Sequence, residues 1–226
     1  EQWARTNSGR ADLSFLVSDL IRASSTDVTA IRFPSGDKGA VRGFDGHLVS
    51  AISGLNVPLG TSLWEFGTDA DYQGKFLLDF RKRTSETDPV TRAKTTLVLV
   101  SPWTWDSSKS NNKIEDWVAA RKAQSNWYDV VVLDGVALEH WLQARPAVAA
   151  YHARTTLACV PPDGVQSTDE FWSEFCSRFQ PKLTEEVVLC ERADEAKDLL
   201  AKLLGPPDIF RVAADAPDEA IAFATA

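Results

Sequence analysis

The chain has 226 residues, of which 44% are hydrophobic and 25% are charged, and its formal net charge is −8. This composition is typical of a globular protein and excludes collagen-like, low-complexity and disordered chains. No apolar run approaches the roughly 20 residues of a membrane-spanning helix, so we expect no membrane partner. The three cysteines are widely spaced and form no CxxC pair. They argue against zinc and predict a cytoplasmic, reducing location.

The charge is unevenly distributed along the chain. Residues 1–155 hold 18 Lys or Arg and 18 Asp or Glu, whereas residues 156–226 hold 6 and 14. The pI near 4.9 argues against nucleic-acid binding by the chain as a whole. The acidic surplus belongs to the second segment, however, and the first is neutral with a basic run, FRKRT, at 80–84. Nucleic acid therefore stays open as a ligand of the first segment.

Hydrophobic periodicity predicts alternating helices and strands in the first segment. Apolar residues recur at helical spacing in some stretches, and short β-prone runs lie between turn residues in others. TTLVLVS and YDVVVLDG are almost continuously apolar, which is typical of strands buried on both faces. Thr68 is expected to cap the second helix, and Gly74 weakens that helix. The expected helices are 11–24, 68–84, 113–124 and 136–144, and the expected strands are 28–33, 47–53, 62–67, 95–101 and 128–135.

This order predicts an α/β layered domain with a central mixed sheet flanked by helices, over residues 1–155. Residues 156–184 are predicted to be a linker with an amphipathic helix at 168–180. Residues 185–226 are predicted to begin a second, incomplete α/β domain, with strands around EEVVLCER and IFRVAAD and helices at 193–205 and from 217. The chain also lacks Met, so we expect the native protein to be longer.

Two acidic residues stand out in the hairpin region. Asp45 lies in RGFDGHLV, where Asp-Gly between β-prone segments predicts a turn. Glu65 lies in SLWEFGT, where strand alternation places Leu63, Glu65 and Gly67 on one face. A carboxylate in such an apolar segment requires a partner. The partner is either a cation such as Arg32, Arg42 or Lys75, or backbone N–H groups, or a metal.

Two carboxylates on neighbouring strands suit a magnesium ion. Mg²⁺ prefers hard oxygen ligands, and waters complete its shell. A lysine close to such a pair would complete a site for phosphodiester hydrolysis. Asp45 and Glu65 are therefore candidate ligands of Mg²⁺ or Mn²⁺.

The ordered set of motifs resembles the restriction-endonuclease-like PD-(D/E)XK nucleases, and within them the Mrr-like branch. That pattern has a helix, an Asp on a hairpin, a strand with Glu-x-Lys, a helix and two buried strands. GFDG matches the Asp and WEFG the Glu, and TLVLVSPWTW and VVVLDGVALEHWL match the closing strands with their helices. The resemblance covers roughly residues 10–152. It implies a metal-dependent DNA endonuclease with Asp45 and Glu65 as catalytic metal ligands.

One position departs from the family pattern, because Gly67 stands where Glu-x-Lys has its lysine. Some members of the superfamily carry this lysine on the following helix, and the resemblance therefore implies Lys75 as the catalytic lysine. Lys75, Asp79 and Lys82 share one helical face. If that face lies over the sheet edge, Lys75 reaches the site; if it faces outward, it is a solvated stripe.

Further residues are weaker candidates. Arg81, Lys82 and Arg83 would suit contacts to the DNA backbone, although a basic helix C-terminus explains them equally well. Asp19 and His47 could add an acid and a water-positioning group, but a solvated helix position and an ordinary strand histidine are the simpler readings. Other residues have structural interpretations: His140 and His152 as structural or exposed histidines, and Asp134 as part of a strand-to-helix turn.

The resemblance also implies the protein's setting. The domain would be the N-terminal effector of a larger bacterial antiphage defence protein, followed in the same chain by a sensing or NTPase-like region suggested by VVLCERADEAKDLLAKLL. A homo-oligomer is expected when the enzyme is active, because two sites are needed to cut both strands. The alternative is a catalytically inactive nuclease-like scaffold that binds nucleic acid or a partner protein, with Gly67 marking the lost lysine.

Overall fold

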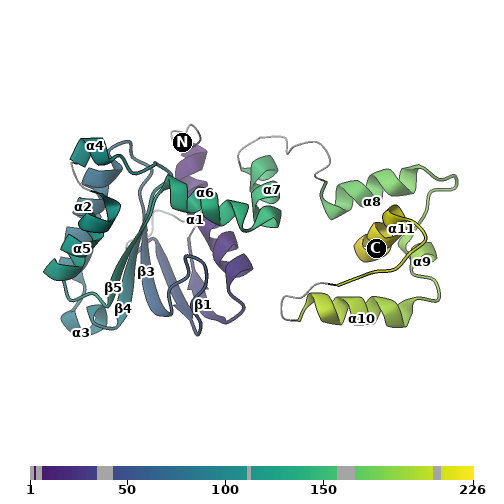
Figure 1. Ribbon diagram of the computed structural model, residues 1–226, viewed down its shortest axis with the longest axis horizontal. Coiled ribbons are helices and arrows are strands. Elements are labelled where there is room, and N and C mark those ends of the chain that lie inside the picture. Colours follow the sequence, from purple (N-terminus) through teal and green to yellow (C-terminus); the bar gives the residue numbers. More distant parts are fainter. Residues whose placement is uncertain (1–2, 4–6, 35–42, 111–112, 157–165, 206–209) are drawn as a thin grey trace. The chain divides into compact units, whose positions relative to one another are not determined.

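The structure is a computed structural model that describes residues 3, 7–34, 43–110, 113–156, 166–205 and 210–226 (Figure 1). The chain divides into two compact units, Glu1–Pro161 and Pro162–Ala226. Unit 1 is an α/β layered domain and contains both acids of the predicted site. Within the described residues, no helix combines the length and apolar character needed to cross a membrane.

Unit 1 contains one five-stranded mixed sheet in the order β1-β2-β3-β4-β5. β1 pairs antiparallel with β2 and β2 with β3, whereas β3–β4 and β4–β5 are parallel. Each parallel pair is joined through a helix that crosses one face of the sheet, as parallel pairing requires. The strands are β1 Val28–Arg32, β2 Gly46–Ser50, β3 Gly60–Phe66, β4 Thr95–Val100 and β5 Asp129–Leu133.

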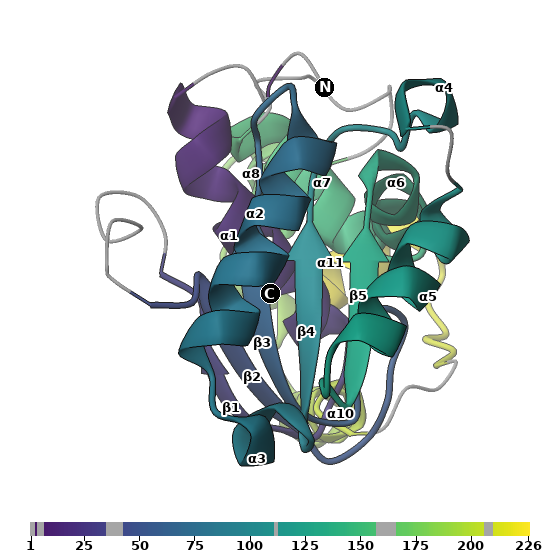
Figure 2. The same ribbon diagram turned by 90° about the vertical axis from the view of Figure 1, so that its left-hand side faces the viewer.

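Helices cover both faces of this sheet, and Figure 1 shows α2 and α5 on one side and α1, α6 and α7 on the other. Figure 2 looks onto the α2 side, where α2 lies over the middle of the sheet. The helices of unit 1 are α1 Asn7–Ser24, α2 Tyr72–Glu86, α3 Pro89–Arg92, α4 Ser107–Ser110, α5 Ile114–Gln124, α6 Gly135–Gln143 and α7 Pro146–Thr155.

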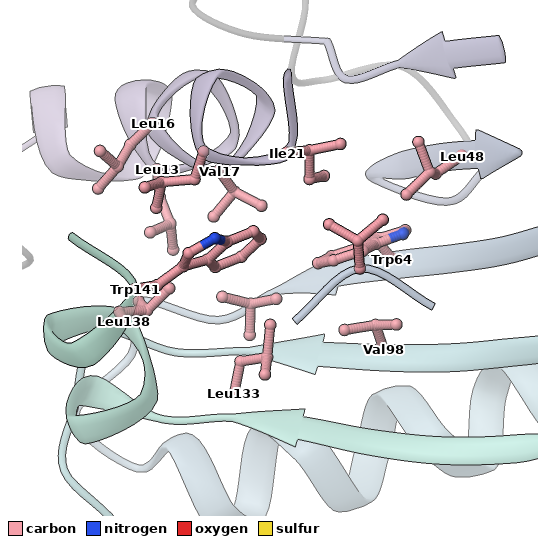
Figure 3. Packing of buried hydrophobic residues seen from close by; sticks show 13 residues of the cluster. Leu13, Leu16, Val17, Ile21, Leu48, Trp64, Val98, Leu133, Leu138 and Trp141 are labelled. Carbon is pink, nitrogen blue, oxygen red and sulfur yellow. The ribbon is translucent and has the colours of Figure 1, made fainter. Parts of the chain in front are cut away.

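The core on the α1 side is built by one set of alternating strand residues. Trp64 and Val98 lie on the side of the sheet that faces Ile21 of α1, and Trp141 of α6 lies beside Leu13 and Val17 of the same helix (Figure 3). Full burial of these side chains removes a large apolar area from water, which is the main favourable term in folding. The residues that alternate with them point to the opposite face of the sheet.

A second core lies between the sheet and the α2–α5 layer. Leu97 and Leu99 of β4 pack there against Phe76 and Phe80 of α2 and Trp117 of α5. Leu63 of β3 borders this cluster, so the face shared by residues 63, 65 and 67 is the α2 face. Glu65 is therefore a buried acid in a mainly aromatic and aliphatic layer.

The strands and longer helices of unit 1 lie within a few residues of their predicted places, and the general α/β class is confirmed. α7 was not predicted, because its alanine-rich sequence has a weak apolar stripe. α2 begins later than expected: Asp71, rather than Thr68, is its N-cap and accepts a hydrogen bond from Gly74 N at 3.2 Å. Asp134 is the N-cap of α6, which confirms the strand-to-helix turn.

Unit 2 differs from its prediction. Its described residues form helices α8 Thr168–Ser177, α9 Glu185–Val188, α10 Ala193–Leu203 and α11 Pro217–Thr225, and no strand. The strand expected near EEVVLCER is α9, and residues 210–214 are extended without a ladder. An apolar run forms a strand only where a neighbouring backbone supplies its hydrogen bonds, and these described residues supply none. The predicted α/β character of residues 185–226 is therefore wrong for the part that the structure describes.

Two of the three cysteines lie in the described part of unit 2, and both are free thiols. Cys176 is buried and Cys190 is exposed. Cys159 lies outside the described residues.

The cap of α2 gives a prediction in which one substitution has different effects in two backgrounds. A Cβ on Gly74 would clash with Asp71 Oδ2, so Gly74→Ala must displace the capping carboxylate. We expect Gly74→Ala to leave the free energy of unfolding nearly unchanged, because the loss of the cap costs about 1 kcal/mol and the gain in helix propensity is about 1 kcal/mol. In an Asp71→Ala background, which has no cap to lose, the same change should raise the free energy of unfolding by up to about 1 kcal/mol. Urea unfolding of the four proteins measures both effects, and equal stabilisation in the two backgrounds would contradict the cap.

Candidate functional site

The structure brings the two predicted acids to the same edge of the sheet. Asp45 precedes β2 directly, and Glu65 lies one residue before the end of β3. Because β2 and β3 are antiparallel, the start of one meets the end of the other, with Gly46 opposite Trp64. Asp45 Oδ2 accepts a hydrogen bond from Phe66 N at 2.9 Å. The carboxylate of Asp45 is therefore tied to the strand that carries Glu65.

Glu65 projects into the layer beneath α2 and is only 3% exposed. Its Oε1 accepts a hydrogen bond from Arg83 Nε at 2.6 Å. Arg83 is not among the partners considered from the sequence, which were Arg32, Arg42, Lys75, backbone N–H groups and a metal. The sequence signal that could have identified it is its helical spacing, because Arg83 lies eight residues after Lys75 on the same face of α2.

Lys75 lies over the end of β3, at the position where the strand lacks a side chain. A Cβ on Gly67 would come within 3.3 Å of Lys75 Cγ, so the lysine stem occupies the space that a side chain at residue 67 would enter first. Lys75 Nζ donates to both carboxylate oxygens of Asp79, at 2.5 and 2.6 Å. The lysine-bearing face of α2 thus lies over the sheet edge, and it does not form an outward solvated stripe.

Asp79 belongs to this cluster although it was not predicted as a site residue. Its side chain is buried, and its negative charge acts on both Asp45 and Glu65. The mutual influence of these groups brings three carboxylates and the cations Lys75 and Arg83 into one electrostatic cluster. Its sequence signal was the i, i+4 spacing from Lys75.

Burial dominates the ionisation of the two strand-borne acids. It raises the pKa of Asp45 above its ordinary value, and the hydrogen bond from Phe66 opposes the shift only in part. Burial also raises the pKa of Glu65 to about 7, opposed by the hydrogen bond from Arg83 and reinforced by the charge of Asp45. A further positive charge at this edge would favour the ionised form of both groups.

Arg83 is an internal residue and not a surface one. Its guanidinium donates to Glu65, to Glu86 Oε2 at 2.8 Å and to the Gly43 carbonyl. Burial works to lower the pKa of Arg83, but Glu65 and Glu86 outweigh this effect and the pKa is raised. The prediction that Arg83 is available to a DNA backbone is therefore wrong for this conformation, because a buried carboxylate takes priority over solvent.

Arg81 and Lys82, the other two predicted backbone contacts, are exposed on α2. The sequence predicted that Lys75, Asp79 and Lys82 share one face of α2. In the structure the third residue on the sheet-facing side is Arg83, and Lys82 is exposed. Helical spacing places both residue 82 and residue 83 near the face of Lys75, and pairing with the buried Glu65 selects Arg83.

The remaining candidates do not join the cluster. Asp19 Oδ2 lies 2.9 Å from Nε2 of the buried His152, and this pair joins α1 to α7 on the opposite face of the sheet. His140 is exposed on α6. His47 is half-buried in β2, opposite Leu63. Asp19 and His152 thus stabilise the packing of two helices.

Asp45 and Glu65 have the donor chemistry for a hydrated magnesium ion. Among the described residues, no donor reaches Asp45 Oδ1 or Glu65 Oε2, since Phe66 N and Arg83 Nε donate to the other oxygen of each group. Within the same residues no group of three or more His, Cys, Asp or Glu side chains is arranged to hold a metal. Mg²⁺ needs only one or two protein carboxylates when waters and phosphate complete its shell. The two carboxylates fit that mode and not an all-protein cage.

Comparison with known proteins finds no matching family, no matching curated sequence and no matching solved structure. The case for a function therefore depends on the geometry of the site.

The raised pKa of Glu65 predicts how stability depends on pH without metal. The native state keeps the proton up to about pH 7, whereas the unfolded chain loses it near the ordinary value of 4.5. The unfolded state therefore binds fewer protons between these values, and the free energy of unfolding falls as pH rises through that window. The loss is on the order of 3 kcal/mol, at 1.36 kcal/mol per pKa unit.

Urea unfolding in EDTA between pH 4.5 and 8 measures this dependence. Glu65→Gln should flatten most of the slope, while Glu115→Gln, an exposed carboxylate on α5, should leave it unchanged. Equal slopes in wild type and Glu65→Gln would show that Glu65 is not the titrating group.

Proposed function

We propose that unit 1 is a metal-dependent DNA endonuclease domain of the PD-(D/E)XK type, related to the Mrr-like branch. The observation that carries the proposal is the position of Lys75. Its stem fills the space beside Gly67, two residues beyond Glu65, where the family pattern has its lysine. This position supports Lys75 as the substitute for the lysine that the pattern has at residue 67.

The arrangement of the sheet supports the same proposal. A helix, an antiparallel β1-β2-β3 meander, a crossing helix and a parallel β4 follow one another in the order that the resemblance implies. The start of β2 and the end of β3 supply Asp45 and Glu65 at one edge. This order explains why the charge of Asp45 acts on the ionisation of Glu65, which lies 20 residues later in the chain.

Asp45 and Glu65 would hold Mg²⁺ or Mn²⁺ through the oxygens that protein donors leave unused. Such an ion, when bound, lowers the pKa of a coordinated water and neutralises charge that develops on the phosphate. Hydrolysis then adds the water oxygen to phosphorus and breaks one P–O ester bond, and one water proton ends on the leaving alcohol. The protein's part is to hold the two carboxyl groups at one partly buried edge, where the charge of a bound cation would favour their ionised forms.

Lys75 would supply the third element of the site. Its ammonium is a compact charge with three donors, suited to orienting a water or stabilising a phosphate oxygen. The side chain is 33% exposed and therefore accessible to a substrate, whereas its partner Asp79 is 9% exposed. Asp79 holds the ammonium at the edge when no phosphate is present. Arg81 and Lys82 remain the proposed contacts to the DNA backbone, since both are exposed on the same helix.

The biological setting is proposed from the resemblance alone. It suggests an effector of antiphage defence that acts as a homo-oligomer, linked to a C-terminal sensing or NTPase-like region. The described helices of unit 2 carry no argument for or against that region.

Plasmid cleavage by the full chain tests the endonuclease proposal. Wild type should cut with Mg²⁺ or Mn²⁺ and stop cutting in EDTA. Asp45→Asn, Glu65→Gln and Lys75→Met should each lose at least about 100-fold in rate, as expected for groups that act on transition-state charge. Lys94→Met is the matched control, because Lys94 is exposed and precedes the start of β4, which pairs with the start of β3 and not with the end that carries Glu65.

The outcome also separates the endonuclease from an inactive scaffold. Metal-dependent cutting that survives all three substitutions would exclude this site as its source. DNA binding without metal-dependent cutting by wild type would instead favour the scaffold that binds nucleic acid.

A transplanted lysine tests the role of Lys75 directly. Shortening residue 75 opens the space beside Gly67, so Gly67→Lys combined with Lys75→Ala returns an ammonium from the strand position. We expect the double variant to cut at least about tenfold faster than Lys75→Ala alone, because a positioned proton-transfer group contributes about 10²–10⁴-fold to the rate. Gly67→Arg with Lys75→Ala is the control for charge without a compact ammonium. If the folded double variant cuts no faster than Lys75→Ala, Lys75 does not perform the role of the lysine that the family pattern has at residue 67.

A further inference from the structure

Arg83 makes contacts that link both candidate metal ligands. We propose that Arg83 is a positioning residue that holds Asp45 and Glu65 in the arrangement required by a divalent cation, an inference that rests on the function proposed above. The resemblance did not suggest this role, and the sequence placed Arg83 at a DNA backbone. The evidence for this role is the set of three acceptors that its guanidinium nitrogens contact.

The first contact orients Glu65. Arg83 Nε donates to Oε1 at 2.6 Å, and both side chains are buried, at 7% and 3% exposure. The hydrogen bond fixes which carboxylate oxygen faces α2 and leaves Oε2 without a donor among the described residues. A buried ionised carboxylate needs such a partner to stay charged.

The second contact holds the turn that carries Asp45. Arg83 Nη2 donates to the Gly43 carbonyl, and the guanidinium carbon lies 4.8 Å from the centre of the Phe44 ring. Gly43 has a φ of +122°, a left-handed conformation that favours glycine. Asp45 lies two residues after Gly43, and its Oδ2 accepts a hydrogen bond from Phe66 N. The guanidinium therefore connects the backbone before one ligand with the carboxylate of the other.

The third contact anchors Arg83 itself. Nη1 donates to Glu86 Oε2 at 2.8 Å, one turn further along α2. The planar guanidinium thus meets Glu65, Gly43 and Glu86 at once, which a lysine cannot do because it is a point charge on a flexible stem. An arginine kept for charge alone would not need this geometry.

The chemistry of the arrangement points to a cation site. Pairing a buried carboxylate with arginine is a weak source of stability, because desolvation offsets much of the attraction. Here the pair leaves one oxygen of Glu65 without a donor and keeps the Asp45 turn beside it. Residues that orient metal ligands in this way usually contribute 10–100-fold to metal affinity, by typical values for outer-shell partners.

Mn²⁺ binding and amide exchange of the full chain test this role. Arg83→Lys is the main variant, because it keeps a cation for Glu65 and thus the fold, but loses the contact to Gly43. We expect it to weaken Mn²⁺ binding by at least about tenfold in calorimetry with a DNA oligonucleotide present. Arg121→Lys is the matched control: Arg121 lies over the Trp117 ring at 5.1 Å in the same layer and donates to Gln124 rather than to either ligand. Arg83→Met, which removes the charge, should weaken binding further.

Hydrogen exchange without metal supplies a readout that a general loss of stability would not reproduce. The Phe66 amide, which donates to Asp45, should exchange at least about tenfold faster in Arg83→Lys, while the amides of Val98 and Leu99 in β4 keep their wild-type rates. Uniformly faster exchange across β4 would show a structural role only and overturn the inference.

The binding outcomes separate the two proposals. Wild-type affinity in Arg83→Lys overturns the role of Arg83 and leaves the nuclease proposal intact. Absence of Mn²⁺ binding by wild type with DNA present overturns the proposed function, and the role of Arg83 with it.

Discussion

The structure of the candidate site depends on one constraint, the burial of the Glu65 carboxylate in an aromatic and aliphatic layer. Glu65 is 3% exposed, and an unpartnered carboxylate at that depth would protonate or prevent folding. Arg83 meets this requirement from α2, and its guanidinium also holds the turn before Asp45. The interaction therefore joins the helix to two strands at the edge where the acids lie.

The charges on α2 complement those on the sheet. Lys75, Asp79 and Arg83 follow one another at intervals of four residues, which places them along one stripe about 12 Å long at 1.5 Å per residue. Lys75 lies over the end of β3 at Gly67, and Arg83 reaches Glu65 two residues earlier in the strand. α2 connects two parallel strands, β3 and β4, and therefore runs opposite to them. For this reason Lys75, near its start, lies at the end of β3, and Arg83, further along, lies over an earlier residue of that strand.

The two cations on this stripe differ in exposure, with Arg83 buried and Lys75 accessible to solvent. Arg83 is buried and paired with Glu65, whereas Lys75 is one-third exposed and paired with Asp79. A site that binds a cation and a phosphate needs both, because rigid ligands reduce the cost of ordering and an open side admits the ligand. Burial raises the pKa of Asp45 and Glu65 because it disfavours their charged forms, and a positive charge beside them would reverse that effect.

The sequence by itself determined the α/β class of unit 1, the approximate strands and longer helices, and the face shared by Leu63, Glu65 and Gly67, because hydrophobic periodicity and turn residues are local signals. It also identified Asp45, Glu65 and Lys75 as residues that belong together, although it did not identify their partners. Only the tertiary structure decided that Arg83 turns inward while Lys82 stays exposed, since both lie at allowed helical spacings and the buried Glu65 selects between them. The same reason explains why the described residues of unit 2 form no strand: a β-prone run becomes a strand only when another backbone pairs with it, and the run alone does not determine that pairing.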